Sequence, residues 1–204
     1  MQLDPDTHQM TAIVLAGIGE LGFELYAPID RARTVLDVVE AEGRGEGIRA
    51  CGFRAMLACR IEKGYRHWGH DVGPDDDPLA AGLGFAVAWD KRADFVGRAA
   101  LEAKRAEPRS RRLLHFAIDD AGAMLHHDEP IWRDGERMGL VTSGAWGYTV
   151  DAAVGLGWAE RADGAIDASW VRAGRWEIEI AGERFPARAS LRAFYDPKSE
   201  RVKG

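Results

Sequence analysis

The sequence predicts an α+β protein in two parts, of which the second is a small antiparallel β-barrel or sandwich. Up to about residue 108, stretches with helical spacing of apolar residues lie between short apolar or alternating runs. Beyond residue 111, short strand-like runs follow one another with turn signals at near-regular spacing. Glycine, at 24 of 204 residues, favours many tight turns over a helical bundle. We therefore divide the chain into residues 1–108 and 109–204.

The first part is expected to begin with two short strands. An apolar run at 11–16 predicts a buried strand, and the alternation at 23–26 predicts a second. Apolar spacing then predicts a helix over 30–41, capped by Asp30, and a second helix over 48–62.

The rest of the first part is less regular. Residues 65–77 show no period and are rich in Gly, Asp and aromatic residues, so we expect a loop. Asp77 followed by Pro78 is a helix start signal, the run 84–89 predicts a strand, and 94–107 predicts a helix.

The second part is expected to consist of strands without a helix. Clean alternation over 176–180, followed by a turn at 181–184, predicts a hairpin with the next strand. The expected strands cover residues 113–118, 130–132, 137–142, 154–158, 170–171, 176–180 and 185–189. This pattern favours a small closed or sandwiched sheet.

Composition excludes several kinds of partner. The net charge of −6 and the pI of about 5.6 argue against nucleic acid or an anionic membrane. No apolar run approaches the roughly 20 residues of a membrane span, and the polar N-terminus lacks a signal-peptide segment. Two cysteines can form neither a disulfide framework nor a four-thiolate zinc site. We therefore expect a cytoplasmic protein.

A glycine motif resembles a dinucleotide-binding fingerprint. Gly17, Gly19 and Gly22 follow an apolar run with the spacing of that motif. However, the residues after Gly22 alternate and reach Pro28 within six positions, so no helix begins there to hold a pyrophosphate. We interpret the motif as a tight connection between two strands and expect no flavin or NAD on this chain.

A second cluster resembles a metal site. His67, His70 and Asp71 have the spacing of metal ligands, but a metal site needs three or four ligands with supporting contacts. The neighbouring carboxylates at 75–77 are explained more simply as a solvated turn. We expect no metal, and a packed loop whose imidazoles bond to backbone groups.

Glu24 stands out because it lies between Phe23 and Leu25 at the end of the glycine turn. On a strand, its side chain faces away from both neighbours. The carboxylate then either points to solvent or binds a planar donor pair, such as the edge of a pterin ring or a guanidinium-like group. The local pattern alone favours solvent.

Several stretches, taken in order over almost the whole chain, resemble one family. They are Gly19–Tyr26, Cys51-Gly52 with Arg60–Gly64, Tyr65–Asp71, Pro78–Leu83, Trp89–Lys91 with Phe95–Arg98, Gly139–Gly144 and Phe194–Pro197. The family is that of the glycine-cleavage T-protein, an aminomethyltransferase. The stretch Tyr65–Asp71 is similar, more narrowly, to the folate domain of sarcosine and dimethylglycine dehydrogenases.

The resemblance implies tetrahydrofolate chemistry, in which a one-carbon unit on an amine passes to a folate nitrogen. It implies that Glu24 holds the edge of the pterin, which reverses the local interpretation of this residue. The resemblance also makes Gly19, Glu20 and Trp89 candidate folate-binding residues. It further implies a partial T-protein-like α/β domain followed by the barrel.

Three departures from the family pattern bear on activity. First, a tyrosine of the family falls on Gly17. Second, an arginine of the family falls on Met56, and the nearby Arg54 should point elsewhere. Third, the catalytic aspartate of the family matches no residue of this sequence. We therefore assign no catalytic residue and expect an incomplete catalyst. A complementary N-terminal or dehydrogenase subunit and self-association are the expected partners. The alternative is a non-catalytic interaction subunit that kept the fold and lost the folate site.

Overall fold

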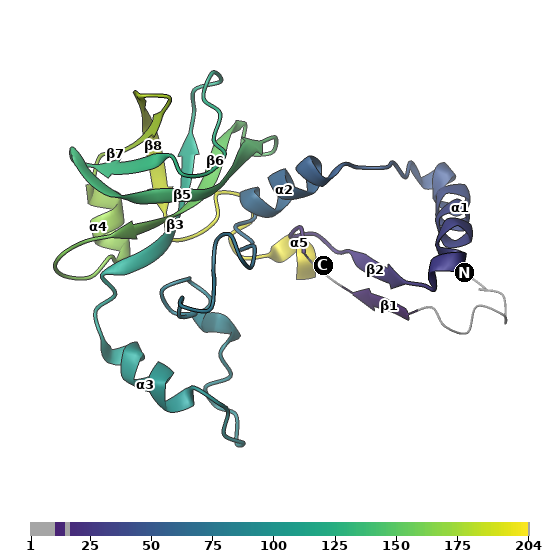
Figure 1. Cartoon of the computed structure of the whole chain (residues 1–204), viewed down its shortest axis with the longest axis horizontal. Coiled ribbons are helices and arrows are strands. Elements are labelled where there is room, and N and C mark those ends of the chain that lie inside the picture. The colour runs from purple at the N-terminus through teal and green to yellow at the C-terminus, as the bar shows by residue number, and fades with distance from the viewer. Residues whose placement is uncertain (1–10, 15–16, 204) are drawn as a thin grey trace.

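The computed structural model describes residues 11–14 and 17–203. Figure 1 shows a barrel with an arm that projects from it; helix α2 links the two. The arm contains β1 (Thr11–Val14), β2 (Phe23–Tyr26) and α1 (Ala32–Gly43). Helix α2 covers Phe53–Glu62, and α3 covers Arg98–Ala106. The expected α+β class is confirmed.

The second part is a closed barrel of six antiparallel strands. The strand order around the barrel is β3-β6-β5-β4-β7-β8. The strands are β3 (Arg111–Ile118), β4 (Pro130–Arg133), β5 (Glu136–Gly147), β6 (Ala152–Glu160), β7 (Trp176–Ile180) and β8 (Glu183–Ser190). Of the two expected alternatives, barrel and sandwich, the barrel is the one observed.

The barrel core is apolar and close-packed. Phe116, Ile131, Val141 and Ile178 are fully buried within it. Gly139 allows β5 and β6 to approach, because a Cβ atom there would lie 2.0 Å from the backbone oxygen of Trp158 on the neighbouring strand. No described residue of the arm belongs to this core.

The expectation that the second part lacks helices was wrong. Residues 170–171 lie in helix α4 (Ala168–Ala173) rather than in a strand, and α5 covers Glu200–Lys203. The Asp167 side chain caps α4 by accepting a hydrogen bond from the backbone N–H of Trp170 at 2.8 Å. This cap overrides the strand preference of the Trp-Val pair.

Three expectations in the first part also need correction. The helix expected from residue 48 begins at Phe53, and Asp30 lies in a short 3₁₀ turn without capping α1. Residues 84–89 form no strand: a 3₁₀ turn covers Gly84–Ala86, and the Trp89 indole closes it on the Gly84 carbonyl. Asp77 accepts from two backbone N–H groups, but only a turn follows.

The two expected strands of the arm pair with each other as an antiparallel hairpin. Residues 15–16 of the first expected strand lie outside the described residues. Neither β2 nor α1 has a buried residue, and large apolar side chains such as Phe23 and Leu36 are more than half exposed. The arm therefore presents an apolar surface that no described part of the chain covers.

Helix α2 is anchored on the barrel at its C-terminal end. Ile61 packs against Ala117, Ala152 and Val154 of the barrel. Buried Glu62 accepts hydrogen bonds from the backbone N–H groups of residues 149 and 150, at 2.6 and 2.9 Å. The β5–β6 turn thus fixes the end of α2.

No helix in these described ranges could cross a bilayer; α1, for example, has only 12 residues.

Replacing Glu62 with Ala should lower the free energy of unfolding by about 1–3 kcal/mol, because two backbone N–H groups of the β5–β6 turn lose their buried carboxylate acceptor. Glu62→Gln, which keeps a carbonyl acceptor, should recover part of this loss. Chemical denaturation measures both. The exposed Glu136→Ala serves as control, and equal effects of E62A and E136A would contradict the assignment.

Candidate functional site

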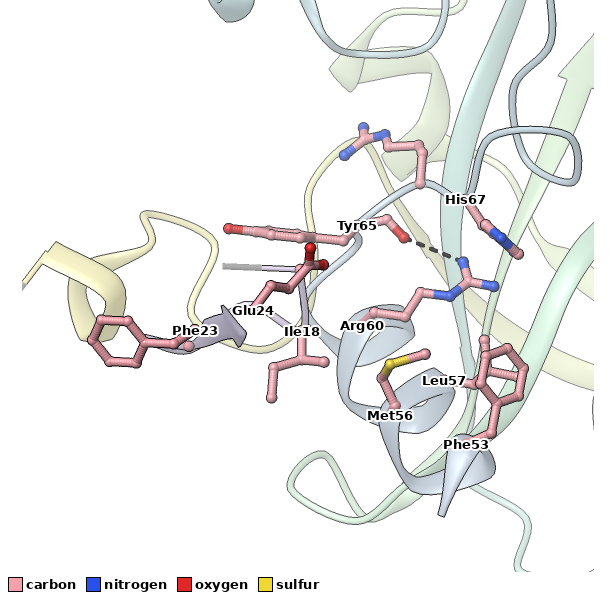
Figure 2. Close-up of a pocket in the computed structure, with 12 residues that line it drawn as sticks. Ile18, Phe23, Glu24, Phe53, Met56, Leu57, Arg60, Tyr65 and His67 are labelled. Atoms are coloured by element: carbon pink, nitrogen blue, oxygen red, sulfur yellow. Dashed lines mark hydrogen bonds between the residues drawn. The ribbon is translucent and has the colours of Figure 1, made fainter. Parts of the chain in front are cut away.

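A cavity of about 470 Å³ lies where the arm meets α2 and the loop that follows it. The β1–β2 turn contributes one side, α2 a second and the loop a third (Figure 2). The lining residues are Gly17, Ile18, Gly22, Phe23, Glu24, Phe53, Met56, Leu57, Arg60, Tyr65, Arg66 and His67. An apolar pocket with a few charged groups is the usual form of a small-molecule site.

Glu24 brings a carboxylate to this cavity. Figure 2 shows its side chain directed toward Tyr65, while the Phe23 ring points away from the helix. The Tyr26 hydroxyl donates a hydrogen bond of 2.5 Å to Oε2 of Glu24. This bond and the nearby negative charge raise the pKa of Tyr26, since both favour the protonated phenol. Both side chains are exposed, and Tyr26 orients the carboxylate through this one hydrogen bond.

The α2 wall of the cavity is apolar. Phe53, Met56 and Leu57 line it, and the first two are substantially exposed to the open space. Met56, on which the resemblance places a family arginine, gives the α2 wall an apolar thioether. Arg54 is not among the lining residues, as expected.

A buried ion pair fixes the base of the cavity. Arg60 Nη1 lies 2.5 Å from Asp71 Oδ2, and the same nitrogen donates to the Tyr65 carbonyl at 3.2 Å. The Arg60 Nη2 donates to Ser143 Oγ of the barrel at 2.8 Å. One side chain of α2 thus holds the loop and the barrel together.

Asp71 is the centre of this network. Its side chain is fully buried and also accepts from the backbone N–H of His67 and from Thr142 Oγ1. Its backbone carbonyl accepts from the Trp158 indole at 2.8 Å. The sequence analysis did not predict this role, although the stretches that resemble the family include both Arg60 and Asp71.

The other side of the glycine turn faces the C-terminal segment. Gly19 is buried with a φ of +84°, and a Cβ atom there would lie 2.1 Å from Lys63 Cγ. Glu20 accepts a hydrogen bond of 2.8 Å from the Tyr195 hydroxyl. Buried Lys63 pairs with Asp196 of the same segment. These contacts hold the turn in place.

Of the four candidate folate-binding residues, only Glu24 lines the cavity. Gly19 and Glu20 support the turn from behind. Trp89 lies under Arg105, 4.7 Å from guanidinium to ring centre, away from the cavity lining. Folate contacts of these three residues stay predictions.

The His67 and His70 rings stack with their centres 4.9 Å apart, and both residues are exposed. The Asp71 carboxylate pairs with Arg60 and not with these two imidazoles. Across residues 11–14 and 17–203, no group of three or more His, Cys, Asp or Glu residues could hold a metal ion. The expected bonds from these imidazoles to backbone groups are replaced by ring stacking.

His115, on β3, is buried beside the segment that carries Gly64 and Arg66. Burial, and then the positive charge of Arg66, lower its pKa from 6.5 to about 3. The imidazole is therefore neutral at physiological pH. It packs so closely on the chain that a Cβ atom at Gly64 would lie 2.2 Å from its Cε1.

Comparison with known proteins identifies the two parts. The family model of the GCVT N-terminal domain matches residues 5–91, and that of the glycine cleavage T-protein C-terminal barrel domain matches 111–196. Sarcosine dehydrogenase from human mitochondria is 37% identical over 198 residues, which are 97% of this chain and 22% of that protein. The regulatory subunit of mouse mitochondrial pyruvate dehydrogenase phosphatase is 36% identical over 183 residues, 85% of this chain and 21% of the relative.

The fold is also known from a solved structure. The crystal structure of glycine cleavage system aminomethyltransferase T from Bartonella henselae superposes with a TM-score of 0.73 at 24% identity. The match covers 88% of this chain and 48% of that structure. This chain thus spans about half of the solved structure and about a fifth of the two relatives above.

Fold and site together define an α+β protein with a carboxylate-bearing pocket beside a closed barrel. The chain belongs to the glycine-cleavage T-protein (aminomethyltransferase) family, as the resemblance predicted. The division at residues 108 and 109 stays a prediction.

Protonation of His115 should make the fold sensitive to mild acid. The unfolded chain binds a proton below pH 6.5, whereas the folded chain does so only near pH 3. Stability is therefore complete above 6.5 and falls by about 1.4 kcal/mol per pH unit below it. Urea denaturation between pH 7 and 5 measures this slope.

His115→Gln should flatten the slope between pH 7 and 5, whatever its effect on absolute stability. His126→Gln, at an exposed position, should leave the slope unchanged. A slope in His115→Gln equal to that of the unchanged chain would refute the role of this imidazole.

Proposed function

We propose that this chain carries the pterin-binding part of a tetrahydrofolate-linked aminomethyl-transfer domain. The observation that supports this most directly is the Glu24 carboxylate on an otherwise largely apolar cavity next to α2. Family membership and the name of the dehydrogenase relative agree with one-carbon amine chemistry.

The residues present fit a reduced pterin. The cavity of about 470 Å³ is in the range of small-molecule sites, and its α2 wall can cover a flat ring. A carboxylate with two oxygens can accept two adjacent N–H donors from the ring edge. The Tyr26 hydroxyl donates to one of the two Glu24 oxygens, and no other hydrogen bond to this carboxylate is found among the described residues.

Each residue of the site has a binding role. Glu24 orients the ring edge, Phe53 and Met56 exclude water from one face, and Arg60 keeps the wall in place through Asp71. When bound, tetrahydrofolate would supply the nitrogen that receives the one-carbon unit. No described residue is assigned a proton-transfer role here, so we expect full activity only with further polypeptide.

That polypeptide has a place to bind. The arm exposes apolar side chains on β2 and α1, and the solved family structure is about twice the length that this chain matches. We expect an aspartate-bearing segment or a dehydrogenase subunit to cover this surface; self-association is the competing way to bury it.

A non-catalytic interaction module is the second candidate function. The regulatory subunit of mouse pyruvate dehydrogenase phosphatase is 36% identical to this chain over 183 residues, and its name describes a regulatory role. Gly17 also leaves the cavity without the family's tyrosine. Under this alternative the barrel and arm serve assembly, and Glu24 is dispensable.

Glu24→Gln should weaken binding of tetrahydrofolate about tenfold or more, because a charged acceptor of two N–H groups becomes a neutral amide. Isothermal titration under reducing conditions, with and without a complementary subunit, measures the change. Glu40→Gln on α1 is the matched control, since Glu40 is exposed and does not line the cavity.

Equal affinity of the two variants would contradict the anchoring role of Glu24. The absence of binding to the unchanged chain at millimolar ligand, with or without a partner, would favour the interaction module.

A further inference from the structure

The β1–β2 hairpin that carries Glu24 has few polar contacts with the rest of the molecule. Its strands pair only with each other, and β2 has no buried residue. Over residues 11–14 and 17–31, Glu20 is the one side chain that forms a hydrogen bond or an ion pair with a residue beyond 31. A two-stranded hairpin is only marginally stable by itself in water, so the position of Glu24 depends on this contact.

Both partners of Glu20 lie in the C-terminal segment, which ends beside the hairpin in helix α5 (Figure 1). The Tyr195 hydroxyl donates to Glu20 Oε1 at 2.8 Å, and Arg201 Nε lies 4.0 Å from Glu20 Oε2. The hydrogen bond to Glu20 raises the pKa of Tyr195, because it favours the protonated phenol. A phenol and a guanidinium from the C-terminal segment thus hold the one carboxylate of the glycine turn.

Asp196 fixes the C-terminal segment next to these two partners. Its carboxylate pairs with Lys63, and both side chains are more than nine-tenths buried. The bond from Lys63 lowers the pKa of Asp196 below its ordinary value. Asp196 also accepts from the backbone N–H groups of Glu200 and Arg201, at 2.9 and 3.2 Å. Because a buried ion pair is costly to break, Asp196 determines where Arg201 lies.

The segment is anchored on the barrel just before Tyr195. Phe194 packs on the cluster formed by Ile61 and three barrel residues, and the Arg188 guanidinium lies 4.9 Å from the centre of the Phe194 ring. The Lys63 ammonium lies 5.3 Å from the centre of the Tyr195 ring. A continuous series of contacts therefore runs from the barrel and α2 through this segment to the glycine turn.

We propose that residues 194–201 form a clasp that positions Glu24 for the edge of the pterin, with Tyr195 and Asp196 as its positioning residues. The inference rests on the proposed function for the identity of the ligand. Only three residues separate Glu20 from Glu24, so release of Glu20 would let the Glu24 carboxylate move away from the α2 wall. Neither Tyr195 nor Asp196 lines the cavity of Glu24, so both act through the turn.

The first test compares Tyr195→Phe with Tyr148→Phe by isothermal titration with tetrahydrofolate, under the conditions used for Glu24→Gln. Tyr195→Phe keeps the ring beside Lys63 and removes only the hydroxyl, so the affinity should fall about threefold to tenfold. Tyr148→Phe, at an exposed position outside this cavity, should leave the affinity unchanged.

Asp196→Asn, which leaves buried Lys63 without its counter-charge, should lower the affinity at least as much as Tyr195→Phe. Tyr195→Phe keeps the inference testable if Asp196→Asn does not fold.

A double-mutant cycle with Glu24→Gln separates positioning from a general loss of structure. If Tyr195 acts through Glu24, Tyr195→Phe should lower the affinity for tetrahydrofolate much less in the Glu24→Gln background than in the unchanged chain. Equal losses in both backgrounds, or no loss in the unchanged chain, would overturn the positioning role.

Hydrogen exchange of the chain without ligand tests the clasp independently of tetrahydrofolate. In Tyr195→Phe and Asp196→Asn, the amides of β1 and β2 should exchange at least about threefold faster, while those of β3 and β6 keep their protection. Unchanged exchange in the hairpin would contradict this inference and leave the proposed function intact. Faster exchange in the hairpin, in a chain that binds no tetrahydrofolate with or without a partner, would support the clasp and refute the assignment of the ligand.

Discussion

The buried pair of Arg60 and Asp71 is the interaction on which the site depends. It joins α2, the loop that follows it and two barrel residues, Thr142 and Ser143, through hydrogen bonds of 2.5–2.8 Å. A buried charge without its partner is strongly destabilising, so neither residue can change alone without moving the cavity wall. The barrel thus anchors one wall of a cavity whose lining residues all lie outside the barrel.

The barrel strands could be predicted well because the patterns that define each hairpin lie within a short stretch of sequence. Alternation and turn residues define each hairpin, and the 176–180 strand has the predicted bounds. Helix α4 was missed because one side-chain cap at Asp167 outweighed the strand preference of two residues. In the arm, the 23–26 strand also has its predicted bounds, and the helix predicted over 30–41 lies at Ala32–Gly43, although neither element has a buried residue.

The site was predictable only in part, because several of its contacts join residues far apart in the sequence. Glu24 could be found from its neighbours and from the family resemblance, and the structure places it on a cavity. The partners of Asp71 lie 11 residues away on α2 and 71 residues away in the barrel, and no local pattern encodes such contacts. Glu20 and Gly19 hold the turn against the C-terminal segment, and their folate contacts stay predictions.

A crystal structure of this chain with a bound reduced folate tests the central claim most directly. The account predicts a pterin ring against the Phe53 and Met56 side of α2, with its N–H edge within about 2.7–3.1 Å of the Glu24 carboxylate. A ligand ordered elsewhere, with Glu24 still bound only to Tyr26, would contradict it.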